Sequence, residues 1–394
     1  MRFAIPYLIV MLILAVLALT QGRVSQRLRD RMWLPCGVML LLFFGLRGFV
    51  GDDWMGYKPV YDNIKLSDIH LNVFGHYNFR YEPGFALLAY IVRQIGGRDG
   101  FFFFQFVVAL LQLTLLIRFL RRYADNLPFS LIVFLAMSGI IMLINMMRNT
   151  LAILIFLNGL HYITERRPWP YFITCVVAMS FHISSLLFIP LYFFLHRSLN
   201  KWAYLTIFVL GNLVVLLKVP IFSMGIGAIA DLVGGKIATM VNAYIEDSHM
   251  AALSFTISIG YLERVGTGIL IFLFWDKLLS LRRENAMFIN AMVFYFFFYF
   301  FFSEIREVGH RLGDLFIFGY WILWPDFFKC FPSRLLRFGW GIFLAVYCTL
   351  KVIGTVGYAI TRYENVLTGY TEYRQRIRSH KEEAVEVTKA QQGN

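Results

Sequence analysis

Residues 143–156, LINMMRNTLAILIF, place Arg148 beside asparagines and between two strongly apolar runs. These runs are typical of membrane helices, in which an ionised side chain is costly to keep. Because a guanidinium keeps its proton under desolvation, Arg148 needs an anionic partner, either a carboxylate of the protein or a bound ligand. The other interpretation is structural: an arginine at a break between two helices caps backbone carbonyls. Asn145, one turn earlier, is expected to point into the same cavity.

The composition indicates a membrane protein. Of 394 residues, 59% are hydrophobic and 18% aromatic, whereas only 15% are charged, and this is more apolar than a soluble domain of this length. Apolar stretches long enough to cross a bilayer recur along the chain. We therefore expect an all-α, polytopic integral membrane protein, with residues 1–394 in a single membrane domain. The four cysteines lack metal-ligand spacing, and we expect buried thiols rather than a disulfide or a metal site.

The distribution of charge predicts a topology. A net charge of +13 would suggest nucleic-acid binding in a soluble protein, but most basic residues lie in short connectors, which is the positive-inside pattern. About twelve spans are expected, at residues 3–19, 33–50, 101–116, 130–144, 151–163, 171–182, 183–195, 202–217, 257–275, 287–302, 312–328 and 338–360. The alternation of connectors places both termini outside and puts six basic connectors in the cytoplasm: 23–31, 118–122, 166–167, 197–201, 277–283 and 329–337.

Four segments do not fit this pattern of spans. Residues 85–95 are apolar but too short to cross, so we expect a re-entrant or interfacial helix. Residues 51–83 and 218–256 are predicted to form outward-facing loops, and residues 361–394 a polar tail. The unusual ionisable residues then fall at outward ends of spans or in outward loops: Asp52, Asp53, Glu82, Arg148, His182, Glu263, Arg264, Glu304, Arg306, His310 and Arg311.

Arg47 lies just inside the outer end of the second expected span, ahead of Asp52, Asp53 and Tyr57. A polar site with paired charges explains this pattern. The alternative is an interfacial anchor, because aromatic rings belong at headgroup level and arginine can snorkel. His182 lies where two short spans meet. It is interpreted as a packing hydrogen bond, a donor to phosphate or sugar, or a proton shuttle.

Further arginines lie near the last third of the chain. Arg264 belongs to the beginning of one expected span, and Arg306 and His310 would share a helix face at i, i+4 spacing. An exposed loop face is the alternative for that pair, and a salt bridge with Glu307 is the alternative for Arg311. In total the outward side holds as many as five arginines close to the membrane plane. Because planar guanidiniums bind phosphate oxygens bidentately, the predicted ligand is a lipid-linked phosphate or pyrophosphate.

Several motifs occur in a recognisable order. They are R-x(3)-G-x-D-[aromatic]-x(2)-Y from Arg47 to Tyr57, E-P-G-F at Glu82, N-x(2)-R-x(2)-L-A at Asn145 and Arg148, F-H-x-S at Phe181, R-L-x(2)-[apolar]-F from Arg311 to Phe316, and Y-x(2)-Y at Tyr370 and Tyr373. In this order they resemble the EpsG family of bacterial exopolysaccharide polymerases, which is similar to the Wzy-type O-antigen and capsule polymerases. Trp54 stands where the family usually has tyrosine, and Glu263 and Arg264 lie outside the motif set.

The resemblance implies a Wzy-like reaction at the outward face of the bacterial cytoplasmic membrane. A growing glycan would be transferred from undecaprenyl pyrophosphate to the non-reducing end of another lipid-linked repeat unit, without a cofactor or metal. The implied partners are the lipid-linked oligosaccharide, membrane lipid, and a chain-length regulator and flippase of the same pathway, with no nucleic acid.

Roles for individual residues follow from that implied reaction. Arginines would stabilise the departing lipid pyrophosphate, and a carboxylate or histidine would accept the proton of the attacking hydroxyl. The expected clamp is Arg148, Arg306 and Arg311 with Arg47 behind them, and further binding residues are Arg264, Asn145, His310 and Tyr57. The preferred base is Asp53, followed by Glu82 and then His182.

Three other functions stay open at this point. A flippase or transporter of the same glycan would also need cations, along a path through both leaflets. A membrane O-acyltransferase would need a histidine and an arginine in the membrane. A glycan ligase would use the same donor and differ only in its acceptor.

Overall fold

A computed structural model describes residues 2–69, 81–221, 224–225, 258–304 and 306–392, with the backbone alone described at 306–307 and 383–392. The described part of the chain is built from helices, which confirms the predicted class. Its contacts divide the chain into two compact units, which are described separately: unit 1 is Met1–Tyr192 with Phe338–Asn394, and unit 2 is Phe193–Arg337. That both units form one membrane domain stays a prediction.

Four described helical segments are long and apolar enough to cross a membrane, namely Arg2–Thr20, Phe101–Tyr123, Leu127–Ile144 and Arg334–Val356. Shorter apolar helices are Pro168–Phe181, Ile183–Phe193, Lys201–Leu216 and Asn285–Phe301. Helix length and composition therefore identify an integral membrane protein. The expected dozen spans stay a prediction.

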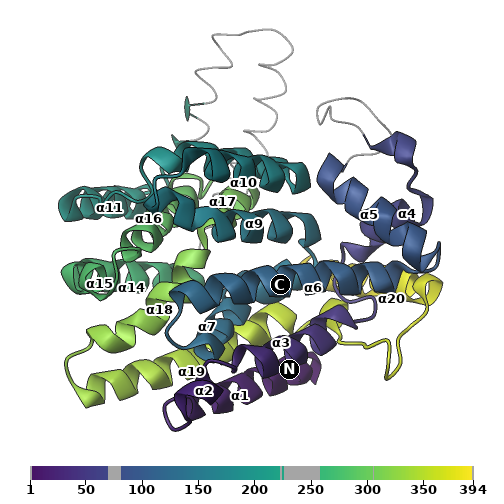
Figure 1. The fold of residues 1–394 in the computed structure, drawn as a ribbon, viewed down its shortest axis with the longest axis horizontal. Helices are drawn as coiled ribbons and strands as arrows, with labels where there is room; N and C mark the ends of the chain where they lie inside the picture. Colours follow the sequence, from purple (N-terminus) through teal and green to yellow (C-terminus); the bar gives the residue numbers. More distant parts are fainter. Residues whose placement is uncertain (1, 70–80, 222–223, 226–257, 305, 393–394) are drawn as a thin grey trace. The chain divides into compact units, whose positions relative to one another are not determined.

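Unit 1 contains α1 (Ile5–Thr20), α2 (Gln26–Arg29), α3 (Trp33–Leu40), α4 (Trp54–Asn63), α5 (Pro83–Gly96), α6 (Phe101–Tyr123), α7 (Leu127–Phe134), α8 (Ile140–Ile144), α9 (Met147–Thr164), α10 (Pro168–Phe181), most of α19 (Arg334–Val356) and α20 (Tyr373–Gln392). Helix α9 packs along both α6 and α10 (Figure 1). Its apolar residues are buried on several sides, as expected for a helix inside a bundle. Gly159 permits the close approach of α10, because a Cβ there would lie 2.7 Å from the Thr174 methyl carbon.

Short irregular helices interrupt several expected spans of unit 1. Span 33–50 passes from α3 into a π-helical turn, Leu41–Gly45, and span 130–144 contains another at Leu135–Gly139. Residues Ile183–Phe193 form a 3₁₀-helix with Pro190 inside it, and proline disfavours a regular α-helix because it lacks an N–H donor. Residues 85–95 do form a helix, α5, although its position in the membrane stays a prediction.

Unit 2 contains α11 (Lys201–Leu216), α14 (Ile259–Leu273), α15 (Trp275–Leu281), α16 (Asn285–Phe301), α17 (Arg306–Gly313) and α18 (Phe318–Cys330). Helix α16 packs against α11, α17 and α18. Side-chain caps begin two of the helices: Asn200 accepts a hydrogen bond from the Trp202 N–H at 2.8 Å, and Ser258 accepts one from the Tyr261 N–H at 3.1 Å. Most of the predicted loop 218–256 lies outside the described residues.

The basic connectors of unit 1 lie together at one end, here called the basic end. The Gln21 side chain, just before connector 23–31, donates at 2.9 Å to the carbonyl of Asp125, just after connector 118–122. Arg122 pairs with Glu165 at 3.3 Å, which adds connector 166–167. This grouping is what the alternation of charge predicts.

The opposite end of unit 1, here called the site end, holds the loop after α3 and the beginning of the tail. The Tyr7 hydroxyl donates to the Thr361 carbonyl at 3.0 Å, and the Gly51 N–H donates to the Ile360 carbonyl at 3.1 Å. Helix α6 connects the two ends and, with 23 residues, is about 34 Å long. The first turn of α1 and the beginning of the tail therefore lie at the same end, while the side of the membrane that the termini face stays a prediction.

Unit 2 shows the same separation of charge. Lys201 pairs with Asp276 at 3.9 Å, and Lys277 donates to the Cys330 carbonyl at 2.9 Å, which brings its three basic connectors together. Arg264 lies in the first turns of α14. Helix α15 follows the other end of α14 and contains most of the basic connector 277–283. The predicted phosphate ligands of unit 2 thus lie away from its basic connectors.

Candidate functional site

Helices α8 and α9 are separated by a break at Met146, whose backbone is not helical (φ −89°, ψ 48°). A break in an apolar environment leaves carbonyls without helical partners, and this is costly unless other donors reach them. Two side chains supply such donors: Arg47 Nη2 to the Ile144 carbonyl at 3.2 Å and Thr150 Oγ1 to the Met142 carbonyl at 2.7 Å. Gln112 Nε2 donates at 3.1 Å to the carbonyl of Met147, the first residue of α9. Arg47 also donates to the Phe44 carbonyl at 2.6 Å. The carbonyl cap of the break is therefore Arg47, which is 2% exposed.

Arg148, in the first turn of α9, has a different partner. Its Nη1 forms an ion pair with Glu82 Oε2, and the other carboxylate oxygen of Glu82 accepts a hydrogen bond from the Ile183 N–H at 3.1 Å. The Glu82 side chain is 6% exposed, whereas that of Arg148 is 21% exposed. The Arg148 guanidinium thus has a fixed anionic partner, and part of the Arg148 side chain stays exposed, whereas its Nε is buried without a hydrogen-bond partner within the described residues.

Aromatic rings surround this ion pair. The Arg148 guanidinium carbon lies 4.4 Å from the centre of the Tyr81 ring, and the Tyr57 hydroxyl is within hydrogen-bonding reach of the same guanidinium. Tyr57, Tyr81 and Phe85 contact one another, with ring centres 5.5–5.7 Å apart. Stacking on a ring favours one orientation of the planar guanidinium.

The E-P-G-F motif explains the position of Glu82. Glu82 is the N-cap residue of α5, and Pro83 occupies the first helical position, where its missing N–H costs nothing. A Cβ at Gly84 would lie 2.8 Å from the Ser180 carbonyl oxygen. Only glycine therefore lets α5 approach the end of α10 closely enough for Glu82 to reach Arg148.

Asp53 lies at the beginning of α4, one turn before Tyr57, and its charge acts on both Tyr57 and Tyr81. Burial, together with the Asp53 carboxylate, raises the pKa of the Tyr57 hydroxyl well above its ordinary range, so this phenol stays protonated. Asn145 accepts a hydrogen bond from the Asp52 N–H at 3.0 Å. This contact joins the loop of Asp53 to the break that precedes Arg148.

His182 ends α10 beside the same cluster. Its Nδ1 lies 2.7 Å from the Ser184 hydroxyl and accepts a hydrogen bond from the Ser184 N–H at 3.3 Å. Because a backbone N–H can only donate, Nδ1 is unprotonated and the ring proton is on Nε2 in the neutral form. The Ser184 hydroxyl in turn lies 3.3 Å from Asn149, in the first turn of α9.

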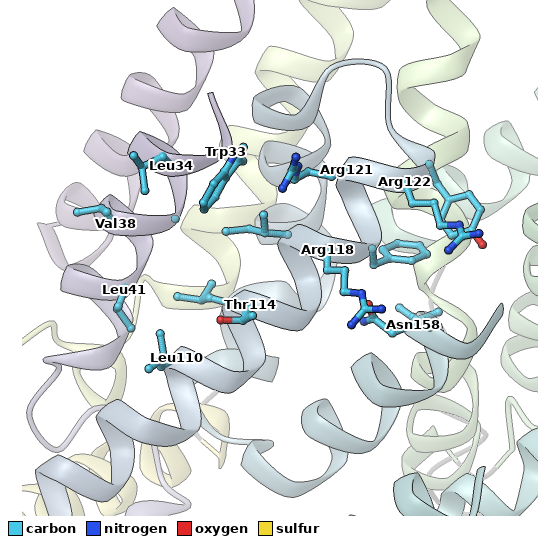
Figure 2. A pocket seen from close by; sticks show the side chains of 16 residues that line it. Trp33, Leu34, Val38, Leu41, Leu110, Thr114, Arg118, Arg121, Arg122 and Asn158 are labelled. Carbon is cyan, nitrogen blue, oxygen red and sulfur yellow. The ribbon is translucent and has the colours of Figure 1, made fainter. Parts of the chain in front are cut away.

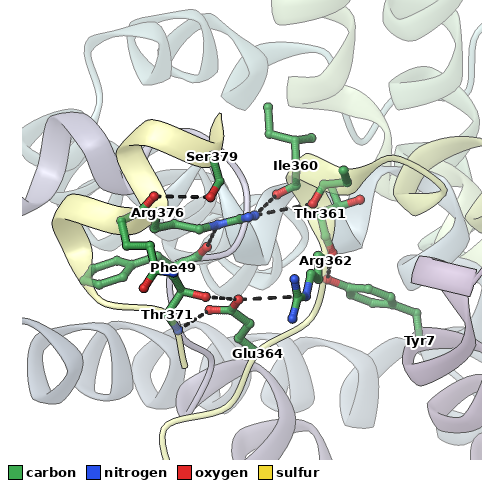
Figure 3. A network of polar contacts seen from close by, with 11 residues as sticks. Tyr7, Phe49, Ile360, Thr361, Arg362, Glu364, Thr371, Arg376 and Ser379 are labelled. Atoms are coloured by element: carbon green, nitrogen blue, oxygen red, sulfur yellow. Dashed lines mark hydrogen bonds and ion pairs between the residues drawn. The ribbon is translucent and has the colours of Figure 1, made fainter. Parts of the chain in front are cut away.

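The polar tail holds the loop that carries Asp53 (Figure 3). Arg376 is 2% exposed, and its guanidinium donates to the carbonyls of Phe49 and Ile360, each at 3.1 Å. Glu364 accepts hydrogen bonds from the Thr371 N–H and hydroxyl at 2.8 and 2.7 Å. Further along α20, His380 contacts Asp52 at 2.7 Å.

Residues 30–370 match the EpsG family. This range is most of the chain. The chain belongs to the EpsG family. No curated protein and no solved structure matched the chain. Family membership associates this EpsG protein with exopolysaccharide synthesis as a polymerase-like membrane protein, and so with an enzymatic role in polysaccharide polymerisation.

Most of the ordered EpsG motifs meet at the site end of unit 1. Gly51 has a left-handed backbone (φ +81°) and directly faces the Asn145 side chain, so that a Cβ there would collide with it. Tyr373 of the terminal Y-x(2)-Y motif contacts Trp54, with ring centres 5.6 Å apart. Residues far apart in the sequence thus build one polar cluster around Arg148.

The remaining predicted residues belong to unit 2. The Arg264 guanidinium carbon lies 3.7 Å from the centre of the Tyr299 ring, and its Nε donates to the Tyr295 hydroxyl at 3.3 Å. The His310 ring also contacts Tyr299, with ring centres 4.7 Å apart. Arg311 is exposed on α17, and Arg306 begins that helix with its side chain outside the described residues.

Sequence reasoning missed two groups of residues in these clusters. Tyr81 directly precedes the E-P-G-F motif, and Asn149 directly follows Arg148, so proximity to a motif was the available signal. Tyr295 and Tyr299 are the two tyrosines, at i, i+4 spacing, in the phenylalanine-rich run of α16. Such spacing places their hydroxyls on one helix face.

Proposed function

We propose that this EpsG protein is a polysaccharide polymerase that extends a lipid-linked glycan at the outer side of the bacterial cytoplasmic membrane. In the proposed reaction, the bond between the anomeric carbon of the growing glycan and an oxygen of undecaprenyl pyrophosphate breaks. A sugar hydroxyl of a second lipid-linked repeat unit forms the new glycosidic bond. Its proton passes to a base, and the departing pyrophosphate takes up the negative charge.

The observation that carries this proposal is the Arg148–Glu82 pair. A guanidinium has five N–H donors, of which Glu82 and Tyr57 use only part, and the remaining donors of this partly exposed side chain are suited to a pyrophosphate oxygen. Tyr81 and Glu82 hold its plane in one orientation. A donor placed in advance where charge develops typically contributes about 10²–10³-fold to the rate, and we assign that contribution to Arg148.

The base is assigned from the contacts of Glu82 and His182 and from the position of Asp53. Both carboxylate oxygens of Glu82 are engaged, one by Arg148 and the other by the Ile183 N–H. His182 presents a protonated Nε2 in its neutral form, which suits a donor to a phosphate or sugar oxygen. Asp53 lies at the beginning of α4, close enough to Tyr57 for its charge to act on that hydroxyl, and it is our proposed base.

The predicted pyrophosphate ligands of unit 2 are a separate part of the proposal. Arg264 is held by Tyr295 and Tyr299, and His310 lies against Tyr299. Arg306 and Arg311 belong to the same helix as His310. We propose that this group also contacts phosphate, without assigning it a chemical step.

The proposal is tested with Arg148→Ala and Asp53→Asn in the native host. Arg167→Gln serves as the control, because it removes an exposed arginine at the basic end. With membrane insertion confirmed, both site variants should accumulate single lipid-linked repeats at the outer leaflet and lose long chains. Repeats that collect at the cytoplasmic leaflet would instead identify a flippase, and unchanged chain length would contradict the proposal.

A further inference from the structure

A groove opens on the surface of unit 1 at its basic end, between α3, α6 and α9 (Figure 2). Its volume is about 650 Å³, which is within the range of small-molecule sites. Exposed apolar side chains, among them Leu34, Val38 and Leu110, line much of it, and arginines of the last turns of α6 lie along one rim. None of the residues assigned to the candidate site lines this groove.

Two of the rim arginines are available to a ligand. Arg118 and Arg121 are exposed, lie one turn apart on α6, and form no ion pair within the described residues. Arg122, by contrast, pairs with Glu165 at 3.3 Å. The Arg121 guanidinium carbon lies 5.1 Å from the centre of the Trp33 ring. This stacking holds one positive charge beside the apolar part of the groove.

The residues that line the groove indicate that it lies at a boundary between membrane and water. Tryptophan and arginine concentrate where a membrane meets water, and the apolar part of the groove extends from Trp33 along the faces of α3 and α6. An occupant that satisfies both parts needs an anionic head at the arginines and a hydrocarbon chain beside Val38 and Leu110. A free phosphate would leave that apolar surface uncovered.

We propose that this groove binds an anionic phospholipid from the leaflet at the basic end. Its phosphate contacts Arg118 and Arg121, and one acyl chain lies along Val38 and Leu110. This inference does not rest on the proposed polymerase activity. It assigns a second, separate lipid contact to unit 1, where a basic cluster beside an apolar groove complements the charge of an anionic headgroup.

The test uses purified full-length protein and native mass spectrometry, with dioleoyl phosphatidylglycerol and dioleoyl phosphatidylcholine as probes. Wild type should retain phosphatidylglycerol over phosphatidylcholine. The double variant Arg118→Gln/Arg121→Gln should reduce that retention about tenfold or more. The matched control Arg27→Gln/Arg31→Gln removes two exposed charges of the same end outside the groove and should behave like wild type.

A second variant tests the apolar half without changing charge. Val38→Trp fills the groove and should weaken retention of dioleoyl phosphatidylglycerol at an unchanged melting temperature, because Val38 is 48% exposed. Equal retention by the arginine variant and its control would overturn the proposal. Unchanged retention in Val38→Trp, combined with competition by free glycerol phosphate, would also overturn it and indicate a site for soluble phosphate.

Discussion

Arg47 and Arg148 approach the same helix break, and the sequence predicts both as pyrophosphate ligands. Arg47 is 2% exposed and donates to the carbonyls of Phe44 and Ile144. The Arg148 side chain is 21% exposed and pairs with Glu82. One arginine thus completes the backbone of the break, and the other is our proposed pyrophosphate ligand.

The comparison teaches that a buried arginine is not by itself evidence of a binding site. The carbonyls of a broken membrane helix need donors, and Arg47 meets that need from elsewhere in the chain. Because Arg47 and Thr150 donate to carbonyls of the break and Arg148 pairs with Glu82, Arg148 does not act as the cap. We therefore leave Arg47 out of the proposed clamp and keep Arg148 as its centre.

The largest effect is expected from exchanging the two charges in Arg148→Glu/Glu82→Arg. The exchange keeps an ion pair in place, so much of the stability lost in either single variant should return. Polymerisation should nevertheless stay about 10²–10³-fold below wild type, because the positive charge no longer sits where the pyrophosphate develops charge. Chain length on gels and the thermal midpoint of the purified protein measure the two properties. Recovery of activity would show that the pair is structural.

Arg47→Met should show the opposite pattern. It leaves the Phe44 and Ile144 carbonyls without their donor, at a cost of about 2–4 kcal/mol in stability. The activity of each folded molecule should change less than tenfold. Thermal inactivation in detergent and activity normalised to folded protein test this. A well-folded Arg47→Met protein that lacks polymerase activity would return Arg47 to the clamp.

Gly51→Ala should have a smaller effect on stability. Gly51 has φ +81° and faces Asn145, so alanine adds backbone strain of about 1–2 kcal/mol as well as a steric contact. The same substitution in an Asn145→Ala background keeps the backbone strain and removes the facing side chain. The difference between the two effects on the melting temperature isolates the contact with Asn145. Equal effects would mean that this contact contributes nothing.

Tyr57→Phe should have the smallest effect. Losing one hydrogen bond to Arg148 costs about 1 kcal/mol, or about a fivefold fall in rate. Burial raises the Tyr57 pKa above its ordinary value, so the neutral phenol stabilises the protein below about pH 10 and this contribution is lost only at higher pH. The pH dependence of polymerisation between about pH 6 and pH 9 should therefore match that of wild type. A shifted profile would identify Tyr57 as a titrating group.

The sequence predicts the helical class and the grouping of charges well, because apolar length and basic connectors report directly on a bilayer. The contacts between distant residues are harder to predict. Nothing in residues 143–156 indicates that Arg47, almost a hundred residues earlier, supplies the cap. Likewise, the apolar run at 183–195 predicts a span, but Pro190 lies within a 3₁₀-helix there. Local patterns thus identified the polar residues, and only their packing separates the cap from the proposed ligand.

The most direct test of the central claim is binding of undecaprenyl pyrophosphate to purified protein, measured for wild type, Arg148→Gln, Arg47→Met and Arg167→Gln. Replacing a charge-assisted contact of about 1.5–3 kcal/mol should weaken binding about 10–100-fold in Arg148→Gln. Folded Arg47→Met and Arg167→Gln should bind within a few-fold of wild type. Unchanged affinity in Arg148→Gln, or an equal loss in Arg47→Met, would contradict the division of roles between the two arginines.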